Sequence, residues 1–346
     1  MDLADDHYRP EIDGLRGFAV AAIMLANAKV GDFSGGLIGF DVFFVISGFL
    51  VTQSILRNAG SGRFSFVNFY ARRARRTMPM VWATVIGVVY LAFFVPGTEP
   101  FEQLLESAAG TALLYNNFLL ATTVGDGMPA LYAPLAHTWA IAAAAQIYLV
   151  LPFIIVFALA RWPDRIVYVL GGMMLASLAL AVLSPPTPQN LFLPQFRAWE
   201  ILAGSMCALL APNMRPNTWF AAIGCLLVAL SVLLIGRLPS PFLSLVPAVA
   251  GTGIILIFTC KDEWVGRALS TRPLAIVGTI SLSVFLIHQP AYELARLAWG
   301  GSASVDQIAV ISLMVFFTSF ATWRIIERPL QPPDHIAAPE DEDDEA

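Results

Sequence analysis

Long runs of apolar residues, separated by short polar segments, repeat along almost the whole chain. About 20 apolar residues make a helix long enough to cross a hydrocarbon core roughly 30 Å thick. Ten runs approach this length, over about 15–30, 37–56, 77–96, 136–158, 165–183, 195–211, 218–236, 242–259, 274–293 and 305–325. The pattern therefore predicts an all-α integral membrane protein with about ten transmembrane helices.

The distribution of lysine and arginine predicts how these spans are oriented, because cytoplasmic loops carry an excess of both residues. With a cytoplasmic N-terminus, most of the basic residues between spans fall on the cytoplasmic side: Arg57, Arg63, Arg72, Arg73, Arg75, Arg76, Arg161, Arg165, Arg215, Lys261, Arg267 and Arg272. The polar first 14 residues lack the features of a cleaved signal peptide. We therefore expect the first span to remain as an anchor and both termini to be cytoplasmic.

An eleventh apolar stretch, residues 101–121, contains Glu102, Glu106, Asn116 and Asn117. If this stretch crossed the membrane, every later loop would change sides and the cytoplasmic excess of basic residues would be lost. We therefore predict a re-entrant segment or one that lies on the outer surface.

Composition excludes a soluble globular domain. Hydrophobic residues make up 57% of the 346 residues and charged residues 13%, with a mean hydropathy of +0.70, whereas soluble domains carry about 25% charged residues. The net charge of −5 comes largely from the acidic end of the chain. We expect residues 1–331 to form the membrane domain and residues 332–346 to form a disordered cytoplasmic tail.

A basic segment precedes the third apolar run. Residues 63–76 combine aromatic side chains with arginines, which is typical of a helix at the membrane interface. The arginines of this segment, Arg72, Arg73, Arg75 and Arg76, allow two interpretations. They could bind anionic lipid and fix the topology, or they could hold the phosphates of a ligand through paired guanidinium contacts.

Polar side chains inside the spans are candidates for function, because an ionisable group at membrane depth is unfavourable unless it is used. Arg16 and Asn27 are eleven positions apart, almost three helical turns, so they share one face of the first span. The other candidates are Asp41, Ser47, His137, Arg197, Glu200, His288, Glu327 and Arg328. Ser47 and Gly48 are also small enough to permit close contact with another helix. Structural alternatives remain: Arg16 could snorkel to the interface, Arg197 with Glu200 could be a buried ion pair, and the histidines could simply end helices.

The three cysteines give no sign of chemistry. Cys207, Cys225 and Cys260 lie in apolar stretches and lack the spacing of a metal site. We expect buried free thiols that act as small hydrophobic side chains, with neither a disulfide nor a bound metal.

Seven sequence blocks, in this order, resemble the acyltransferase-3 family: YRPEIDGLRGFAV, GGLIGFDVFFVISGFLVT, FYARRARRTMP, LAHTWAIAAAAQIYLVLP, FRAWEILAG, ISLSVFLIHQP and WRIIERPL. The resemblance covers about residues 8–331. Members of this family are membrane-bound O-acyltransferases that modify cell-envelope polysaccharides, lipopolysaccharide and related glycans. An SGNH hydrolase-like domain often follows in the family; because an acidic tail stands at that place here, we expect this chain to lack one.

The resemblance implies a multi-pass protein of the bacterial inner membrane that binds no permanent cofactor. Its donor substrate would be acyl-CoA from the cytoplasm, with acetyl-CoA as the first candidate. Its acceptor would be a hydroxyl of an envelope glycan or glycolipid outside. The arginines 72, 73, 75 and 76 would hold the phosphates of coenzyme A. Substrate contacts would come from Asp41, Ser47, Arg197 and Glu200. Membrane lipids are further partners, and we expect no nucleic acid.

Two departures from the family pattern fall at catalytic positions. The family hallmark is an arginine followed, after ten residues, by a histidine that is the proposed base or acyl carrier; Arg16 matches the arginine, but Asn27 stands at the histidine position. The family also carries two glutamates before the glutamine that matches Gln146, and Ala144 and Ala145 stand there. Asparagine and alanine cannot act as a general acid or base at neutral pH, so we expect impaired transfer.

Three functions are compatible with these residues. The first is an acyl-CoA-dependent O-acyltransferase of low activity, in which Arg16, Asn27 and Ala144 occupy catalytic positions and His137 or His288 supplies the base. The second is a non-catalytic relative that binds acyl-CoA or an envelope glycan. The third is a lipid or glycan transporter, whose polar groups would line a central path, although no inverted repeat is visible in the sequence.

Overall fold

Helices and turns make up the part of the chain that the structure describes. The computed structural model describes residues 8–29, 33–60, 64–95, 101–123, 133–185, 187–235, 241–301 and 303–330. Within these ranges no strand forms, which confirms the all-α prediction. The predicted acidic tail, 332–346, lies outside the described residues.

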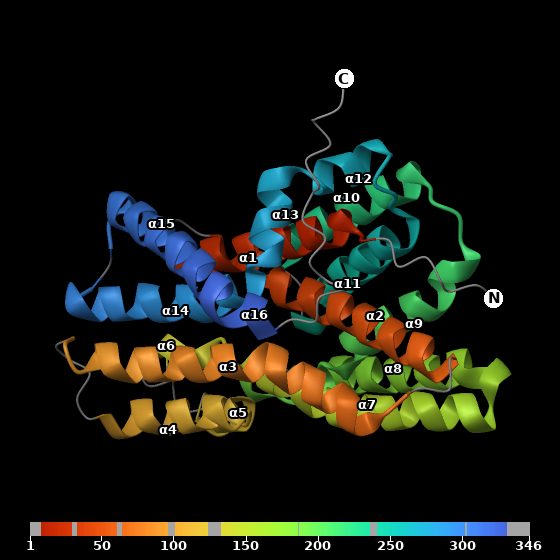
Figure 1. Cartoon of the computed structure of the whole chain (residues 1–346), viewed down its shortest axis with the longest axis horizontal. Coiled ribbons are helices and arrows are strands. Elements are labelled where there is room, and N and C mark those ends of the chain that lie inside the picture. The colour runs from red at the N-terminus through yellow and green to blue at the C-terminus, as the bar shows by residue number, and fades with distance from the viewer. Residues whose placement is uncertain are drawn as a thin grey trace.

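The α-helices carry the labels of Figure 1. In chain order they are α1 (Pro10–Ala28), α2 (Gly39–Gly60), α3 (Phe66–Ala92), α4 (Phe101–Ala112), α5 (Asn116–Thr123), α6 (Ala133–Ala136), α7 (Trp139–Arg161), α8 (Ile166–Leu183), α9 (Ala198–Leu210), α10 (Thr218–Leu234), α11 (Pro241–Phe258), α12 (Trp264–Leu269), α13 (Arg272–Thr279), α14 (Ser281–Ala298), α15 (Val305–Thr322) and α16 (Arg328–Leu330). A π-helical turn, Trp323–Glu327, joins α15 to α16. The 3₁₀ turns are Ser34–Ile38, Pro163–Arg165, Pro188–Leu191, Pro194–Phe196 and Ala211–Asn213.

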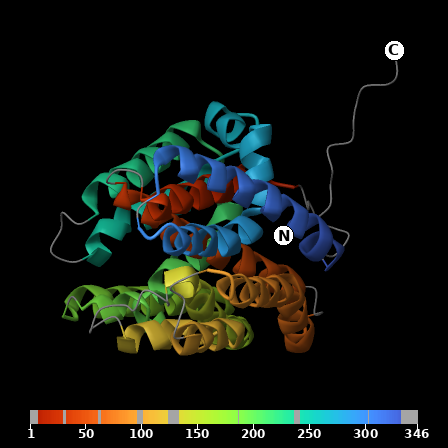
Figure 2. The ribbon, with the colours of Figure 1, turned by 90° about the vertical axis from the view of Figure 1, so that its left-hand side faces the viewer.

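Most of the long helices run along the longest axis of the molecule. One layered series, α15, α14, α3 and α4, is visible in Figure 1 and again in the end view of Figure 2, and each member contacts the next. A second series joins α8, α9, α2 and α7, since α2 packs against both α9 and α7. α1 lies between α13, α2 and α14. The arrangement leaves α2 in the interior.

Four described segments are long and apolar enough to cross a membrane alone: Ser34–Ala59, Ala133–Arg161, Pro163–Leu183 and Val305–Leu330. A fifth candidate is the pair α13 and α14, whose axes meet at 74°. α10 and α11 are apolar but shorter. The protein thus has the apolar helices of a multi-pass membrane protein, but the predicted count of about ten spans is not confirmed.

Charge and helix length explain the difference in count. α1 begins at Pro10 rather than near residue 15, so it includes Glu11 and Asp13 and is less apolar than the run alone. α9 has 13 residues, which is about 20 Å at 1.5 Å per residue and shorter than the hydrocarbon core. The run over 274–293 is not one helix, because the chain breaks after Thr279.

The basic segment and the third apolar run form one helix. α3 covers 27 residues, begins after Ser65 and contains Pro79. The Ser65 side chain caps this helix by accepting a hydrogen bond from the backbone N–H of Asn68. No residue between the arginines and the apolar run ends the helix, so the separate interfacial helix predicted over 63–76 is the first part of α3.

Residues 101–121 form two short helices with a sharp turn. Leu114, between α4 and α5, has a φ of 59°, and the Ser107 hydroxyl donates to the side-chain oxygen of Asn116. The helices have 12 and 8 residues, so neither alone crosses a core of about 30 Å.

We expect the segments on either side of this pair, 97–100 and 124–130, to face the same, outer side of the membrane. Both lie outside the described residues. The reason is the basic residues of the later loops, which fall on the cytoplasmic side only if 101–121 does not cross. A membrane-impermeant thiol reagent should label Thr98→Cys and Asp126→Cys from outside in a cysteine-free background, and Ser61→Cys only after permeabilisation. Labelling of Thr98→Cys and Asp126→Cys from opposite sides would rule out this topology.

Small residues bring α2 and α9 into close contact. A Cβ atom on Gly48 would lie 1.9 Å from the carbonyl oxygen of Ile201, and one on Gly204 would lie 2.0 Å from that of Val45. Neither position can therefore hold a side chain without moving backbone. The close helix contact expected at Gly48 is confirmed.

The cysteines do not share one environment. Cys207 is buried, Cys260 is partly exposed and Cys225 is exposed, and none of the three forms a disulfide. The expectation of burial is wrong for Cys225, because α10 also exposes large apolar side chains such as Trp219 and Leu226. An apolar helix that faces lipid need not bury its side chains in protein. Within the described ranges, no three His, Cys, Asp or Glu residues gather as a metal site.

Candidate functional site

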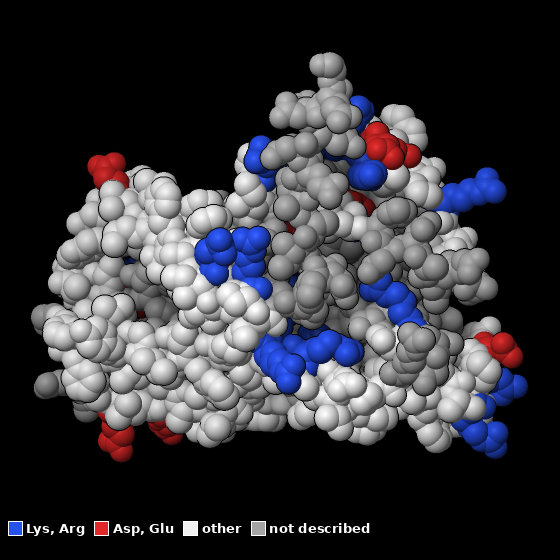
Figure 3. Space-filling model, in the orientation of Figure 1, with Lys and Arg blue, Asp and Glu red and all other residues white. Residues whose placement is uncertain are grey.

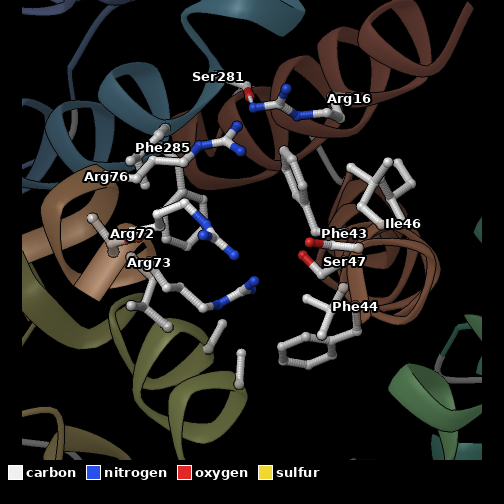
Figure 4. A pocket seen from close by; sticks show the side chains of 18 of the residues that line it. Arg16, Phe43, Phe44, Ile46, Ser47, Arg72, Arg73, Arg76, Ser281 and Phe285 are labelled. Carbon is white, nitrogen blue, oxygen red and sulfur yellow. Dashed lines mark hydrogen bonds between the residues drawn. The ribbon is translucent and has the colours of Figure 1, made fainter. Parts of the chain in front are cut away.

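A cavity of about 700 Å³ lies between α1, α2, α3, α7 and α14. Arg16, Ser47, Arg73 and Phe285 are wall residues from four of these helices (Figure 4), and α7 contributes Ala144. The cavity therefore joins polar positions that are as far apart in the chain as the first and the ninth apolar runs.

The wall of the cavity changes from polar to apolar along α2. Arg57 and Asn58 line one end and Phe40 lines the other. The two ends are about 27 Å apart along the helix axis at 1.5 Å per residue. Between Phe40 and Val51 every lining residue of α2 except Ser47 is apolar. The shape suits an elongated ligand with a charged end and an apolar end.

Five arginines line the cavity: Arg16, Arg57, Arg72, Arg73 and Arg76. No described Asp or Glu side chain lines it. In Figure 4 the guanidinium groups of Arg72, Arg73 and Arg76 point into the space that faces Ser47. A cationic wall without carboxylates attracts anions, and guanidinium groups bind phosphate well. Arg75, predicted with its neighbours, is exposed and is not part of this wall.

Two of these guanidinium groups are held in place by neighbouring residues. Arg16 donates to Asp13 and to the Ser281 hydroxyl, each at 2.8 Å. The guanidinium carbon of Arg73 lies 3.7 Å from the ring centre of Tyr148. Cation–π contact of this kind orients a guanidinium group at little entropic cost. Both arginines are therefore preorganised toward the cavity.

Basic side chains are unevenly distributed on the surface as well. Lys and Arg gather over the middle and right-hand part of the face in Figure 3, whereas the left-hand end shows acidic side chains and few basic ones. The left-hand end is where α14 ends and α15 begins in Figure 1. By the positive-inside rule, this asymmetry predicts that the right-hand side is the cytoplasmic one.

Arg16 and Asn27 both reach α14, as expected of two residues on one face of α1. Arg16 bonds to Ser281, and the Nδ2 atom of Asn27 lies 3.0 Å from Nε2 of His288. Their surroundings differ, however, because Arg16 lines the cavity and Asn27 does not. Asn27 lies about 16 Å further along α1, beyond the apolar end of the cavity.

The two candidate histidines lie together at that end. The ring centres of His137 and His288 are 5.2 Å apart, and His137 lies 5.1 Å from Phe285. Both imidazoles are buried, with 3% of His137 and 0% of His288 exposed. Neither ring nitrogen of His137 has a hydrogen-bond partner within the described ranges. Because Phe285 also lines the cavity, the histidines lie directly behind its wall.

Arg197 forms a separate, buried charge cluster. It donates to Asp41 at 2.7 Å and lies 3.0 Å from Glu200, and none of the three side chains is more than 4% exposed. The guanidinium group also lies over the rings of Phe44 and Trp139. None of the three charged residues lines the cavity, so their place in the fold matches the structural alternative, a buried ion pair, more closely than a substrate contact.

The alanine run of α7 meets the cavity at one position. Ala144 lines the cavity, whereas Ala145 does not. Gln146 points away and pairs with Asn117 through two amide hydrogen bonds of 3.0 and 2.9 Å. These bonds attach α5 to α7. A side chain at position 144 would therefore project among the arginines, and one at 145 would not.

Several residues of the site were not singled out by the sequence, and three of them bear on its chemistry. Ser281 and Phe285 line the cavity, and Tyr148 holds Arg73. A signal existed for the first two, because positions 281, 285 and 288 lie on one face of a helix. Tyr148 follows Gln146 in an apolar run and carries no such signal.

Comparison with known proteins supplies the remaining evidence. A family model described as an acyltransferase domain matches residues 9–324. The peptidoglycan O-acetyltransferase OatA of Listeria monocytogenes is 28% identical to this chain, covering 94% of the chain and 56% of the relative. The putative peptidoglycan O-acetyltransferase YrhL of Bacillus subtilis is 29% identical, and O-acetyltransferase OatA of Staphylococcus aureus is 25% identical, with 55% and 57% of each relative covered.

The chain thus spans a little more than half the length of these curated relatives. No solved structure matches it.

Proposed function

The chain belongs to the acyltransferase-3 family, and we propose that it is an O-acyltransferase that moves an acyl group from acyl-CoA to a hydroxyl of a cell-envelope glycan or glycolipid. The names of its relatives make acetyl the first acyl group to test and peptidoglycan the first acceptor. In this proposal the protein lies in the bacterial inner membrane with both termini in the cytoplasm. The donor enters from the cytoplasm and the acceptor is outside.

The cavity is the observation that supports this proposal most strongly. Its five arginines suit the phosphates of coenzyme A, and its apolar section, which reaches Phe40 and Phe285, suits the acyl end. The polar end of α2 lies at Arg57, on the predicted cytoplasmic side. The thioester would then lie toward the histidines and Asn27.

Transfer requires a proton acceptor at the thioester. The acceptor hydroxyl oxygen attacks the thioester carbonyl carbon, the carbon–sulfur bond breaks, and the hydroxyl proton passes through a base to the leaving thiolate. Asn27 cannot take that proton. His288, which lies 3.0 Å from Asn27, and His137 beside it are therefore the candidate bases. Loss of a positioned base lowers a rate by about 10²–10⁴-fold, and we therefore propose weak activity.

Donor binding gives a test that does not depend on turnover. Arg73→Gln with Arg76→Gln should weaken binding of coenzyme A by roughly 100-fold or more, because one charge-assisted hydrogen bond contributes about 1.5–3 kcal/mol. Titration calorimetry on the protein in nanodiscs measures this. Arg75→Gln is a matched control, since Arg75 belongs to the same run but lies outside the cavity, and its change should leave affinity within about twofold.

The outcome separates the candidate functions. Equal losses for Arg75→Gln and for the double variant would show that surface charge, not the cavity, holds the donor. No effect of either change, with reduced membrane insertion, would show that the run only fixes topology. Tight binding of coenzyme A with no acyl transfer would indicate a non-catalytic relative, and passage of unmodified substrate across vesicles would indicate a transporter.

A further inference from the structure

We propose that His288 is a positioning residue, a fixed hydrogen-bond acceptor that orients the side chain at position 27. The two side chains meet at 3.0 Å, between Nε2 of His288 and Nδ2 of Asn27. The geometry of this contact rests on the structure alone, and its effect on transfer rests on the proposed function.

The surroundings of His288 define its tautomer. Nδ1 lies 3.0 Å from the carbonyl oxygen of Val284, which can only accept, so Nδ1 carries the proton. Nε2 faces the Asn27 amide nitrogen, which can only donate, so Nε2 presents its lone pair. If Asn27 presented its oxygen instead, both nitrogens of His288 would need protons. That would place a cation at a residue with 0% exposure and no carboxylate partner within the described ranges, which is unfavourable.

Position 27 is also held through its backbone. Arg296 donates to the carbonyl oxygens of Asn27 and Ala28, both at 2.8 Å. Glu293 accepts from Arg296 at 2.7 Å and from Lys29 at 3.1 Å. These contacts fix the last turn of α1 against α14. The side chain at 27 is thus aimed at His288 by both its backbone and its hydrogen bond.

A fixed hydrogen-bond acceptor at His288 selects the orientation or the tautomer of the side chain at position 27. Asn27 is held so that one amide N–H faces His288. A histidine at position 27 would donate one N–H to His288 and present its other nitrogen as a lone pair, which is the tautomer that can accept a proton. Because His288 itself is completely buried, it acts through residue 27 rather than on the acceptor.

Nitrogen NMR tests the first step on the unmodified chain. With ¹⁵N-labelled histidine in nanodiscs, four histidines give signals, and His288→Gln identifies that of His288. We expect a protonated Nδ1 and an unprotonated Nε2, and Asn27→Ala should shift the Nε2 signal. Asn190→Ala, which removes an exposed amide hydrogen bond elsewhere, should not. A protonated Nε2, or an Nε2 signal that ignores Asn27→Ala, would overturn the proposal.

Activity tests the second step. His288→Phe should lower acyl transfer by roughly 10²-fold in the Asn27→His background, as expected when a catalytic group is misplaced by about 1 Å. His288→Gln, which keeps an acceptor oxygen, should recover part of this loss. In the Asn27 background the fall should be smaller, because no proton-accepting tautomer remains to be selected. Equal falls in both backgrounds would make His288 the base and overturn the positioning role.

Failure of the proposed function is distinguishable from failure of this inference. If Asn27→His transfers no acyl group at all, the proposed function fails, and the nitrogen spectrum still decides the orientation at position 27. If Asn27→His is active but indifferent to His288→Phe, the proposed function stands and the positioning role is wrong.

Discussion

Asn27→His combined with Ala144→Glu should raise acyl transfer by about 10²–10⁴-fold over the unmodified chain, the range that a positioned general base contributes. Asn27 already faces His288 across 3.0 Å, so histidine there meets a ready hydrogen-bond partner. Ala144 lines the cavity, so a glutamate side chain would enter a space that now holds arginines and no carboxylate. The protein should otherwise fold as before, because Asn27 and histidine are both polar and hydrogen-bonded.

Transfer of radiolabelled acyl groups by membranes measures this gain. The double variant should exceed the product of the single variants, since groups that act as one catalytic unit are not additive. Ala145→Glu is the matched control, because Ala145 lies outside the cavity and glutamate there should help less. Robust transfer by the unmodified chain, unchanged by either substitution, would show that another residue carries the chemistry. His137, which is buried beside His288, would then be the first to replace.

Arg197→Met should destabilise the protein by about 3–5 kcal/mol, the effect of leaving buried charges without their partner. Arg197 lies within 2.7 Å of Asp41 and 3.0 Å of Glu200, and all three side chains are buried. Removing the guanidinium group leaves two carboxylates facing each other in the interior. Denaturation of the purified protein, monitored through its loss of coenzyme A binding, measures this change in the free energy of unfolding.

A triple variant separates charge from packing in this cluster. Arg197→Met with Asp41→Asn and Glu200→Gln removes every charge while keeping similar volumes, so it should recover most of the lost stability. If the triple variant is as unstable as Arg197→Met, the loss comes from packing against Phe44 and Trp139. Stability unchanged by Arg197→Met would contradict the burial of the cluster.

The apolar pattern predicted much of this fold because a segment in the membrane must satisfy its backbone hydrogen bonds within itself. A long apolar run therefore forms a helix. The helix class, the shared face of Arg16 and Asn27, and the close contact at Gly48 are all found in the structure. These features depend on helical periodicity and residue size, which are local properties. The cytoplasmic end of each helix remains a prediction from charge.

Features that depend on tertiary packing were not predictable. Arg73 and Arg75 point to opposite sides of α3, but which side meets the cavity depends on packing against other helices, such as the contact of Arg73 with Tyr148. The break after Thr279 lies in a continuous apolar run, and only the bend between α13 and α14 places Ser281 beside Arg16. The exposure of Cys225 likewise depends on which side of α10 meets protein.

In the proposed function, one cavity receives acyl-CoA from the cytoplasm and passes the acyl group to an acceptor on the other side. Sealed inside-out membrane vesicles with the Asn27→His, Ala144→Glu variant test it directly, with acyl-labelled CoA added outside and envelope glycan enclosed. We expect labelled glycan in the lumen, while the coenzyme A itself stays outside. Label that appears in the glycan only after the vesicles are opened, or intact acyl-CoA inside them, would contradict it.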